Sequence, residues 1–183
     1  MRRITASFIL LILLVIANGA VASPKPEIVG IHGQARGREA RVFFALRNAF
    51  TPEMVEALKS GIEISFQTVV RVERVHRRWF NASMGELKFS RSVRYDALSR
   101  VYRLHRSAGE VLLPDVHAAL AGMTQYEIVV PLTSDVESGK TYRVHVRSRL
   151  DKVGLSEPLQ SIFFFSSLWD VETEWTRGYL AAP

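Results

Sequence analysis

The chain has 183 residues, no cysteine, and 24 basic against 18 acidic side chains. The absence of cysteine excludes disulfides, thiol nucleophiles, Cys-ligated zinc and lipid attachment through a lipobox cysteine. Stability must therefore come from an apolar core, and a chain of this length can bury most of its apolar surface as one domain.

The N-terminal residues 1–22 have the three parts of a cleaved secretory signal peptide. Arg2 and Arg3 precede a run of ten apolar residues that starts at Phe8, and an Ala-Val-Ala triplet ends at Ala22. The alternative is an uncleaved anchor, but this run is well short of the roughly 20 apolar residues that span a bilayer. We therefore expect cleavage after Ala22, export to the periplasm, and a single domain over residues 23–183.

Next in the chain, the sequence predicts a strand and then a short helix. Residues 40–48 alternate between apolar and polar side chains, which is typical of an antiparallel strand with one buried and one wet face. Residues 51–61 carry helix boundary signals, with Thr51 as N-cap, Pro52 at the first helical position and Gly61 just past the end. A helix this short must pack on the sheet to be stable.

The longest alternating run covers residues 62–80. Its apolar side chains stand at even positions as far as Val72 and at odd positions from Val75. Because such a shift turns the inward set to the other face, a strand needs a β-bulge to accommodate it. We expect that bulge at Glu73 and Arg74. Further strands are expected over residues 87–106, with Phe89, Val93 and Tyr95 inward, followed by Tyr102 and Leu104.

The remaining segments predict a second short helix and more strands. Pro114 and Asp115 stand at the start of the helix and Gly122 at its end, and residues 125–131 alternate again. Residues 142–150 place valines on one face and Arg143, His145, Arg147 and Arg149 on the other. Strand alternation also fits the C-terminal segment, with Trp169, Val171, Thr173 and Trp175 on one face and Asp170, Glu172 and Glu174 on the other.

Two arginine-rich strand faces are the candidate binding residues. The first strand carries Arg71, His76, Arg77 and Arg78, and the second carries Arg143, His145, Arg147 and Arg149. The strongest candidates for partner binding are Arg77, Arg78 and Trp79, followed by Arg143, Arg147 and Arg149. They could dock an anionic partner, or they could simply be the solvated side of alternating strands. A third possibility is cross-strand pairing with Glu172 and its neighbours, which have the same two-residue spacing.

No pattern in the sequence points to catalysis, a cofactor or a metal. The five histidines lack helical ligand spacing and H-E-x-x-H, and G-x-S-x-G is absent. A nucleic-acid partner is also unsupported, because no recognised spacing of aromatic and basic residues is present. We expect no catalytic, cofactor-binding or metal-ligating residues.

Several stretches carry a resemblance to a known family, namely GIEISF, RWF, YDALSRVYRL, TYRVHVRSRLDK and EPLQSIFFFSSLWDVETEW. The most specific features are Leu150 and Asp151 ahead of Pro158, and Trp169 ahead of Trp175. Together they resemble the bacterial exported proteins of the domain of unknown function 4390. The resemblance implies an export signal, a small mostly β domain in the cell envelope and, in some members, a gene beside a membrane sensor kinase of the nitrogen-regulation type.

The sequence therefore predicts a mainly β protein, an antiparallel β-sandwich of seven to nine strands with immunoglobulin-like architecture and two short helices. We expect a non-catalytic envelope protein that binds another envelope or membrane protein, with the sensor kinase as a candidate. The alternative is a protein that binds anionic lipid or an envelope glycan through its arginine-rich faces.

Overall fold

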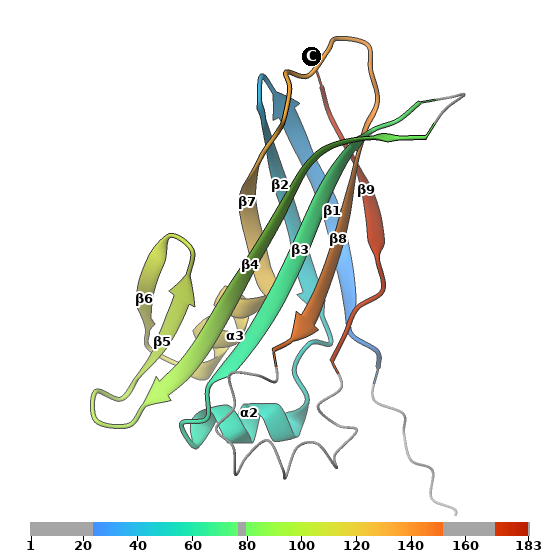
Figure 1. Cartoon of the computed structure of the whole chain (residues 1–183). Helices are drawn as coiled ribbons and strands as arrows, with labels where there is room; N and C mark the ends of the chain where they lie inside the picture. Colours follow the sequence, from blue (N-terminus) through green and yellow to red (C-terminus); the bar gives the residue numbers. More distant parts are fainter. Residues whose placement is uncertain (1–23, 77–79, 152–170, 183) are drawn as a thin grey trace, which may run out of the picture.

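Nine strands and two helices make up the described part of the chain, residues 24–76, 80–151 and 171–182, in a computed structural model (Figure 1). The strands are β1 (Glu27–Arg36), β2 (Glu39–Arg47), β3 (Ile64–Arg74), β4 (Ala82–Asp96), β5 (Val101–Arg106), β6 (Gly109–Leu113), β7 (Gln125–Pro131), β8 (Tyr142–Leu150) and β9 (Thr176–Leu180), and the helices are α2 (Pro52–Lys59) and α3 (Val116–Thr124). The predicted signal peptide, residues 1–22, lies outside the described residues. No helix in the described ranges is long and apolar enough to cross a membrane.

The strands form two antiparallel sheets, ordered β1-β2-β7 and β6-β5-β4-β3-β8-β9. The sheets face each other and bury one set of alternating side chains between them, so the predicted mainly β sandwich with two helices is confirmed. Alternation located this core correctly in several strands. The predicted inward residues that are buried include Val42, Phe44, Leu46, Phe66, Val70, Val72, Val93, Tyr126, Tyr142, Val144 and Val146.

The two sheets are joined along one side, where β9 lies against β1. Ala35 N donates to Ala181 O at 2.7 Å, and Ala181 N donates to Gly33 O at 3.0 Å. On the other side β7 faces β4, and there the described backbone makes one hydrogen bond, from Thr133 N to Met84 O at 2.7 Å. We call the region between β7, β4 and the β5–β6 turn, where these elements line a groove, the open seam.

The predicted irregularity in residues 62–80 exists, but it lies in the neighbouring strand. The pairing of β3 with β4 shifts between Val72 and Glu73, and the extra residue is Met84 of β4. The pairing of β3 with β8 runs without a shift to Arg74. The expectation of a bulge at Glu73 and Arg74 is therefore wrong in its position. Strand β3 ends at Arg74, so the side chain of the half-buried Val75 does not have to follow the alternation of buried and exposed positions in β3.

Both helices begin as the sequence predicts. Thr51 caps α2 by accepting a hydrogen bond from Met54 N at 3.2 Å, and Asp115 caps α3 by accepting from Ala118 N at 2.8 Å. Such caps satisfy amide groups that have no partner inside the helix. Helix α2 lies across one end of the sandwich, and α3 lies at the same end beside the start of β7 (Figure 1).

Candidate functional site

The outward side chains of β3, β4, β8 and β9 form the surface that the sequence singled out. We define the arginine face as the shallow hollow of about 240 Å³ on this sheet. It is lined by Gln67, Val69, Arg71, Lys88, Arg147, Ser148, Arg149, Glu172 and Trp175. The structure therefore brings Arg147 and Arg149 of the second predicted strand together with Arg71 of the first, and adds Lys88 and Trp175 to them.

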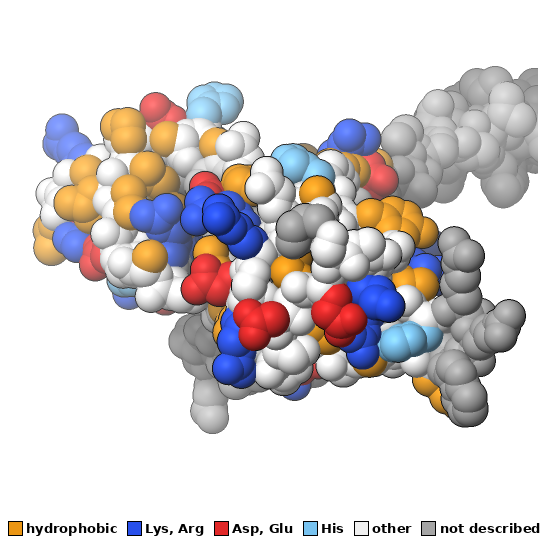
Figure 2. Space-filling model, turned by 90° about the horizontal axis from the view of Figure 1, so that it is seen from above, with side chains coloured by type: hydrophobic (Ala, Val, Ile, Leu, Met, Phe, Trp, Pro, Cys, Tyr) orange, Lys and Arg blue, Asp and Glu red, His pale blue; other side chains and the backbone are white. Residues whose placement is uncertain are grey.

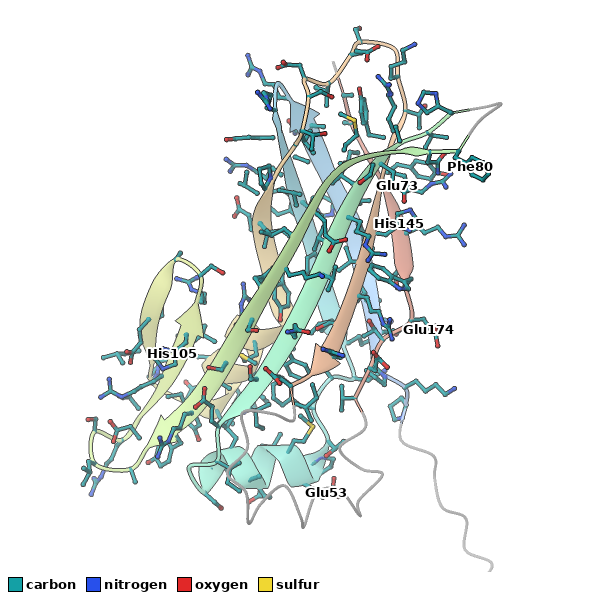
Figure 3. All side chains as sticks on the ribbon, in the orientation of Figure 1. Glu53, Glu73, Phe80, His105, His145 and Glu174 are labelled. Atoms are coloured by element: carbon teal, nitrogen blue, oxygen red, sulfur yellow. The ribbon has the colours of Figure 1, made fainter. Side chains whose placement is uncertain are left out.

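Among the described residues, the predicted Arg143 does not line this hollow. Arg143 lies further along β8, with its guanidinium carbon 5.7 Å from the ring centre of Tyr179. Arg77, Arg78 and Trp79 lie outside the described residues. Phe80, which follows them in the β3–β4 connection, is 97% exposed (Figure 3).

Trp175 is the aromatic centre of the arginine face. The guanidinium carbon of Arg71 lies 4.7 Å from its ring centre, and that of Arg147 lies at 5.9 Å. Both distances are in the range of cation–π attraction. The expectation that Trp175 shares an inward face with Val171 and Thr173 is wrong. Those two residues are buried, but the alternation changes phase before β9 and leaves Trp175 on the outer surface.

Acidic side chains neutralise part of this surface. Arg147 donates to Glu172 at 2.5 Å, and Arg71 donates to Glu86 at 2.5 Å. Hydrogen bonds from Arg71 and Lys88 lower the pKa of Glu86. Cross-strand pairing is therefore confirmed for Arg147, whereas Arg149 donates to the amide oxygen of Gln67 instead, at 2.7 Å.

The same intermixing of charges occurs elsewhere on the molecule. Glu73 of β3 and His145 of β8 lie on neighbouring strands with Oε2 and Nε2 3.3 Å apart (Figure 3). The end view in Figure 2 shows acidic and basic side chains next to one another rather than in separate patches. Within residues 24–76, 80–151 and 171–182, no three His, Asp or Glu side chains are grouped so that they could hold a metal ion.

The pair formed by Arg147 and Glu172 gives a direct test of cross-strand pairing. We expect Arg147→Glu to lower the free energy of unfolding by about 1 kcal/mol, because both side chains are half-exposed and two carboxylates would then be adjacent. Adding Glu172→Arg should restore most of the loss, as measured by urea denaturation. Arg94→Glu, at an exposed position of β4, is the control and should not be rescued by Glu172→Arg. Simple addition of the two single effects would contradict the pairing.

A second concave region lies at the open seam and contains a buried arginine. Arg91 of β4 is 8% exposed, and its Nη1 donates to Gly122 O at 2.7 Å and to Gln125 O at 2.6 Å. Its guanidinium carbon lies 3.9 Å from the ring centre of Tyr126, which stacks on Phe44 at 4.6 Å. These residues line a cleft of about 740 Å³.

Arg91 is a functional candidate that the sequence patterns above do not predict, although the alternation of its strand carries a signal for it. Phe89 and Val93 were both expected to point inward, and Arg91 stands midway between them in the same alternation. Burial lowers the pKa of Arg91. Burial likewise raises the pKa of Tyr126, and the positive charge of Arg91 partly opposes that effect. A guanidinium in this position binds carbonyl oxygens at the end of α3 that the helix itself leaves unpaired.

Neither the curated proteins nor the solved structures contain a significant match to the sequence. A family profile described as domain of unknown function (DUF4390) matches residues 24–178, which is most of the chain and includes both concave regions. The protein therefore belongs to the DUF4390 family.

Proposed function

We propose that this protein is a non-catalytic accessory protein of the cell envelope that binds another envelope protein through the arginine face. The proposal depends mainly on Trp175, a half-buried aromatic ring held between Arg71 and Arg147 in a shallow hollow. Tryptophan and arginine are the residue types most enriched at the energetic centres of protein interfaces. The sensing region of a membrane kinase is the partner that the family resemblance suggests.

The charge of the hollow favours a partner with acidic side chains. Its lining contains four basic residues and one carboxylate, that of Glu172. Because Arg71 and Lys88 pair with Glu86 and Arg147 pairs with Glu172, a partner carboxylate can bind Arg149 without displacing an ion pair. The signal-like residues 1–22 support an envelope location for this interaction.

Site-specific crosslinking in cells tests the proposal. A photo-crosslinking residue at Lys88, inside the hollow, should capture one membrane protein reproducibly, and Trp175→Ala should abolish the capture. The control places the same crosslinker at Leu98, which is 98% exposed on the β4–β5 turn and distant from the hollow. Equal capture from Leu98, or capture that Trp175→Ala leaves unchanged, would contradict the proposal.

The excess of basic residues in the hollow also supports a second candidate, the binding of anionic lipid or an envelope glycan. Flotation with phosphatidylglycerol vesicles separates this candidate from the first. Binding that weakens with added salt and with Arg71→Gln would support it, because exposed charges are screened over about 10 Å at 0.1 M salt. Absence of flotation at every salt concentration would exclude the lipid form of this candidate.

A further inference from the structure

Strand β7 has one free edge, and that edge faces the open seam. Leu132 N donates to Arg38 O at 2.8 Å, which continues the pairing of β7 with β2. Because hydrogen-bonded and non-bonded pairs alternate in antiparallel sheets, the even-numbered residues of β7 are bonded to β2. The backbone N–H and C=O groups of Glu127 and Val129 therefore point into the seam.

Both ends of this free edge are closed. At one end Thr133 N is bound by Met84 O, and a Cβ on Gly85 would lie 2.4 Å from Pro131 O, so the two strands touch there. At the other end Gln125 O is bound by Arg91. Pro131 has no N–H to offer, as is common in edge strands. The open part of the edge is thus short and centred on Glu127 and Val129.

A groove lies beside this open part of the edge. It has a volume of about 230 Å³ and is lined by Leu87 and Phe89 of β4, by Ile128 of β7 and by the β5–β6 turn. It shares Arg91, Arg106 and Glu127 with the larger cleft of about 740 Å³. The two concave regions therefore meet beside Glu127, and the smaller one follows β7 as far as Val129 over the apolar side chains of Leu87, Phe89 and Ile128.

Two arginines without an acidic partner stand at the Gln125 end of this groove. Among the described residues, neither Arg91 nor Arg106 has a carboxylate within ion-pair distance, and the charge of Arg106 helps to lower the pKa of Arg91. Both hydrogen bonds of Arg91 leave from Nη1, so its other nitrogens remain for an anion. Glu127 also lines the groove, but its carboxylate is bound by Arg41 at 2.9 Å on the outer face.

We propose that the open seam binds the C-terminal segment of a partner polypeptide, which adds an antiparallel strand to β7 and places its terminal carboxylate at Arg91 and Arg106. An antiparallel strand on β7 ends beside Gln125, which is where the two arginines stand. Added strands of this kind take affinity from backbone hydrogen bonds and specificity from alternate side chains. Arginine binds carboxylates through strong charge-assisted hydrogen bonds.

The geometry also specifies the sequence of such a peptide. Two cations, Arg91 and Arg106, stand where the groove meets the larger cleft beside Gln125, so a terminal carboxylate is favoured there over a continuing chain. The last residue would lie opposite Tyr126 and the third from last opposite Ile128, both of which point inward. These two positions should therefore be apolar, and the positions between them should tolerate polar residues.

Peptide arrays test the proposal with a defined probe. The purified protein is applied to immobilised short peptides that vary at their last positions and end in a free carboxylate, beside a matched array that ends in carboxamide. We expect selection of apolar residues at the last and third-from-last positions, and binding at least about tenfold weaker to the amidated peptides. Equal binding to both arrays, or no binding to either, would overturn the proposal.

Two variants and one exchange measurement locate the binding on β7. Val129→Pro removes a donor that faces the seam and breaks no bond to β2, so it should abolish peptide binding, whereas Val129→Ala should keep it. Arg106→Gln should weaken binding about tenfold. The amide protons of Glu127 and Val129 should exchange rapidly in the free protein and slowly once a selected peptide is bound. Unchanged exchange at both residues would overturn the proposal.

This site goes beyond the proposed function and can be tested separately from it. Trp175→Ala alters the arginine face but lies outside the groove, so it should leave peptide binding unchanged. Conversely, Val129→Pro should leave the crosslink from Lys88 intact. Loss of both activities in Trp175→Ala would show that the peptide binds the arginine face and would refute the assignment to β7.

Discussion

Replacing Arg91 by leucine is expected to lower the free energy of unfolding by about 3 kcal/mol. The substitution leaves the carbonyl oxygens of Gly122 and Gln125 without their donor in a part-buried position, and it removes the cation over the ring of Tyr126. Each carbonyl group deprived of a hydrogen bond in such a place costs about 1 to 3 kcal/mol. Leucine recovers part of this loss by filling the space with an apolar side chain.

Urea denaturation of the purified protein measures this effect. The matched control is Arg94→Leu on the same strand, because Arg94 is exposed and its replacement should change the free energy of unfolding by less than about 0.5 kcal/mol. Arg91→Lys should fall between the two, because one ammonium group keeps a donor but lacks the planar guanidinium. Equal stabilities of the Arg91→Leu and Arg94→Leu variants would show that the two carbonyl groups find other partners.

Gly33→Ala is expected to destabilise the protein by about 2 to 3 kcal/mol, because β1 has no room for a side chain at this point. An added Cβ would lie 2.1 Å from Arg41 O of the paired strand and 3.0 Å from a methyl group of Leu180. The backbone would have to move, and Gly33 O also accepts the hydrogen bond from Ala181 that joins β1 to β9. The substitution therefore strains the connection between the two sheets.

Gly122→Ala in α3 is the control for this prediction. There an added Cβ would meet the Cδ2 methyl group of Leu104 at 2.7 Å, which is the end of a flexible side chain rather than backbone. Alanine is also favoured over glycine inside a helix by up to about 1 kcal/mol. We expect a change near zero in thermal or urea denaturation. A loss of stability as large as that of Gly33→Ala would mean that the added methyl volume itself is destabilising, whether it meets backbone or side-chain atoms.

Local patterns in the sequence predicted much of the fold. Alternation identified β2, β3, β7 and β8 and their inward residues, because one face of each strand is buried and the other is wet. The side-chain chemistry of Thr51 and Asp115 identified the starts of both helices, because a cap acts within one turn of its own residue. These are the features in which a residue's role depends on its neighbours in the chain.

Features that depend on distant residues could not be predicted in the same way. The bulge lies at Met84 rather than in β3, and the contact of Gly85 with Pro131 depends on how the two sheets approach each other. Trp175 stands just before β9 and lies on the outer face. The pairing of β9 with β8 determines this, and the alternation of residues 169–175 does not predict that pairing. The hydrogen-bond partners of Arg91 could not be predicted either, because Gly122 and Gln125 lie more than 30 residues away in the chain.

In the candidate site, too, only part of the arrangement could be predicted from the sequence. The arginine-rich faces allow three interpretations, and the two-residue spacing favours one of them, cross-strand pairing, which the structure confirms for Arg147 and Glu172. The spacing could not show that Arg71 and Lys88 lie on the same surface as Arg147, because the order of their strands in the sheet does not follow from the sequence. The predicted group formed by Arg77, Arg78 and Trp79 lies outside the described residues.

The composition of β7 also has a consequence for self-association at high concentration. An unpaired strand edge can template sheet growth between copies of a protein, and long regular edges are a common cause of aggregation. In β7 the available groups are confined to Glu127 and Val129, a proline follows, and Glu127 carries a charge. Copies of the chain therefore have too few free groups on this edge to polymerise through it.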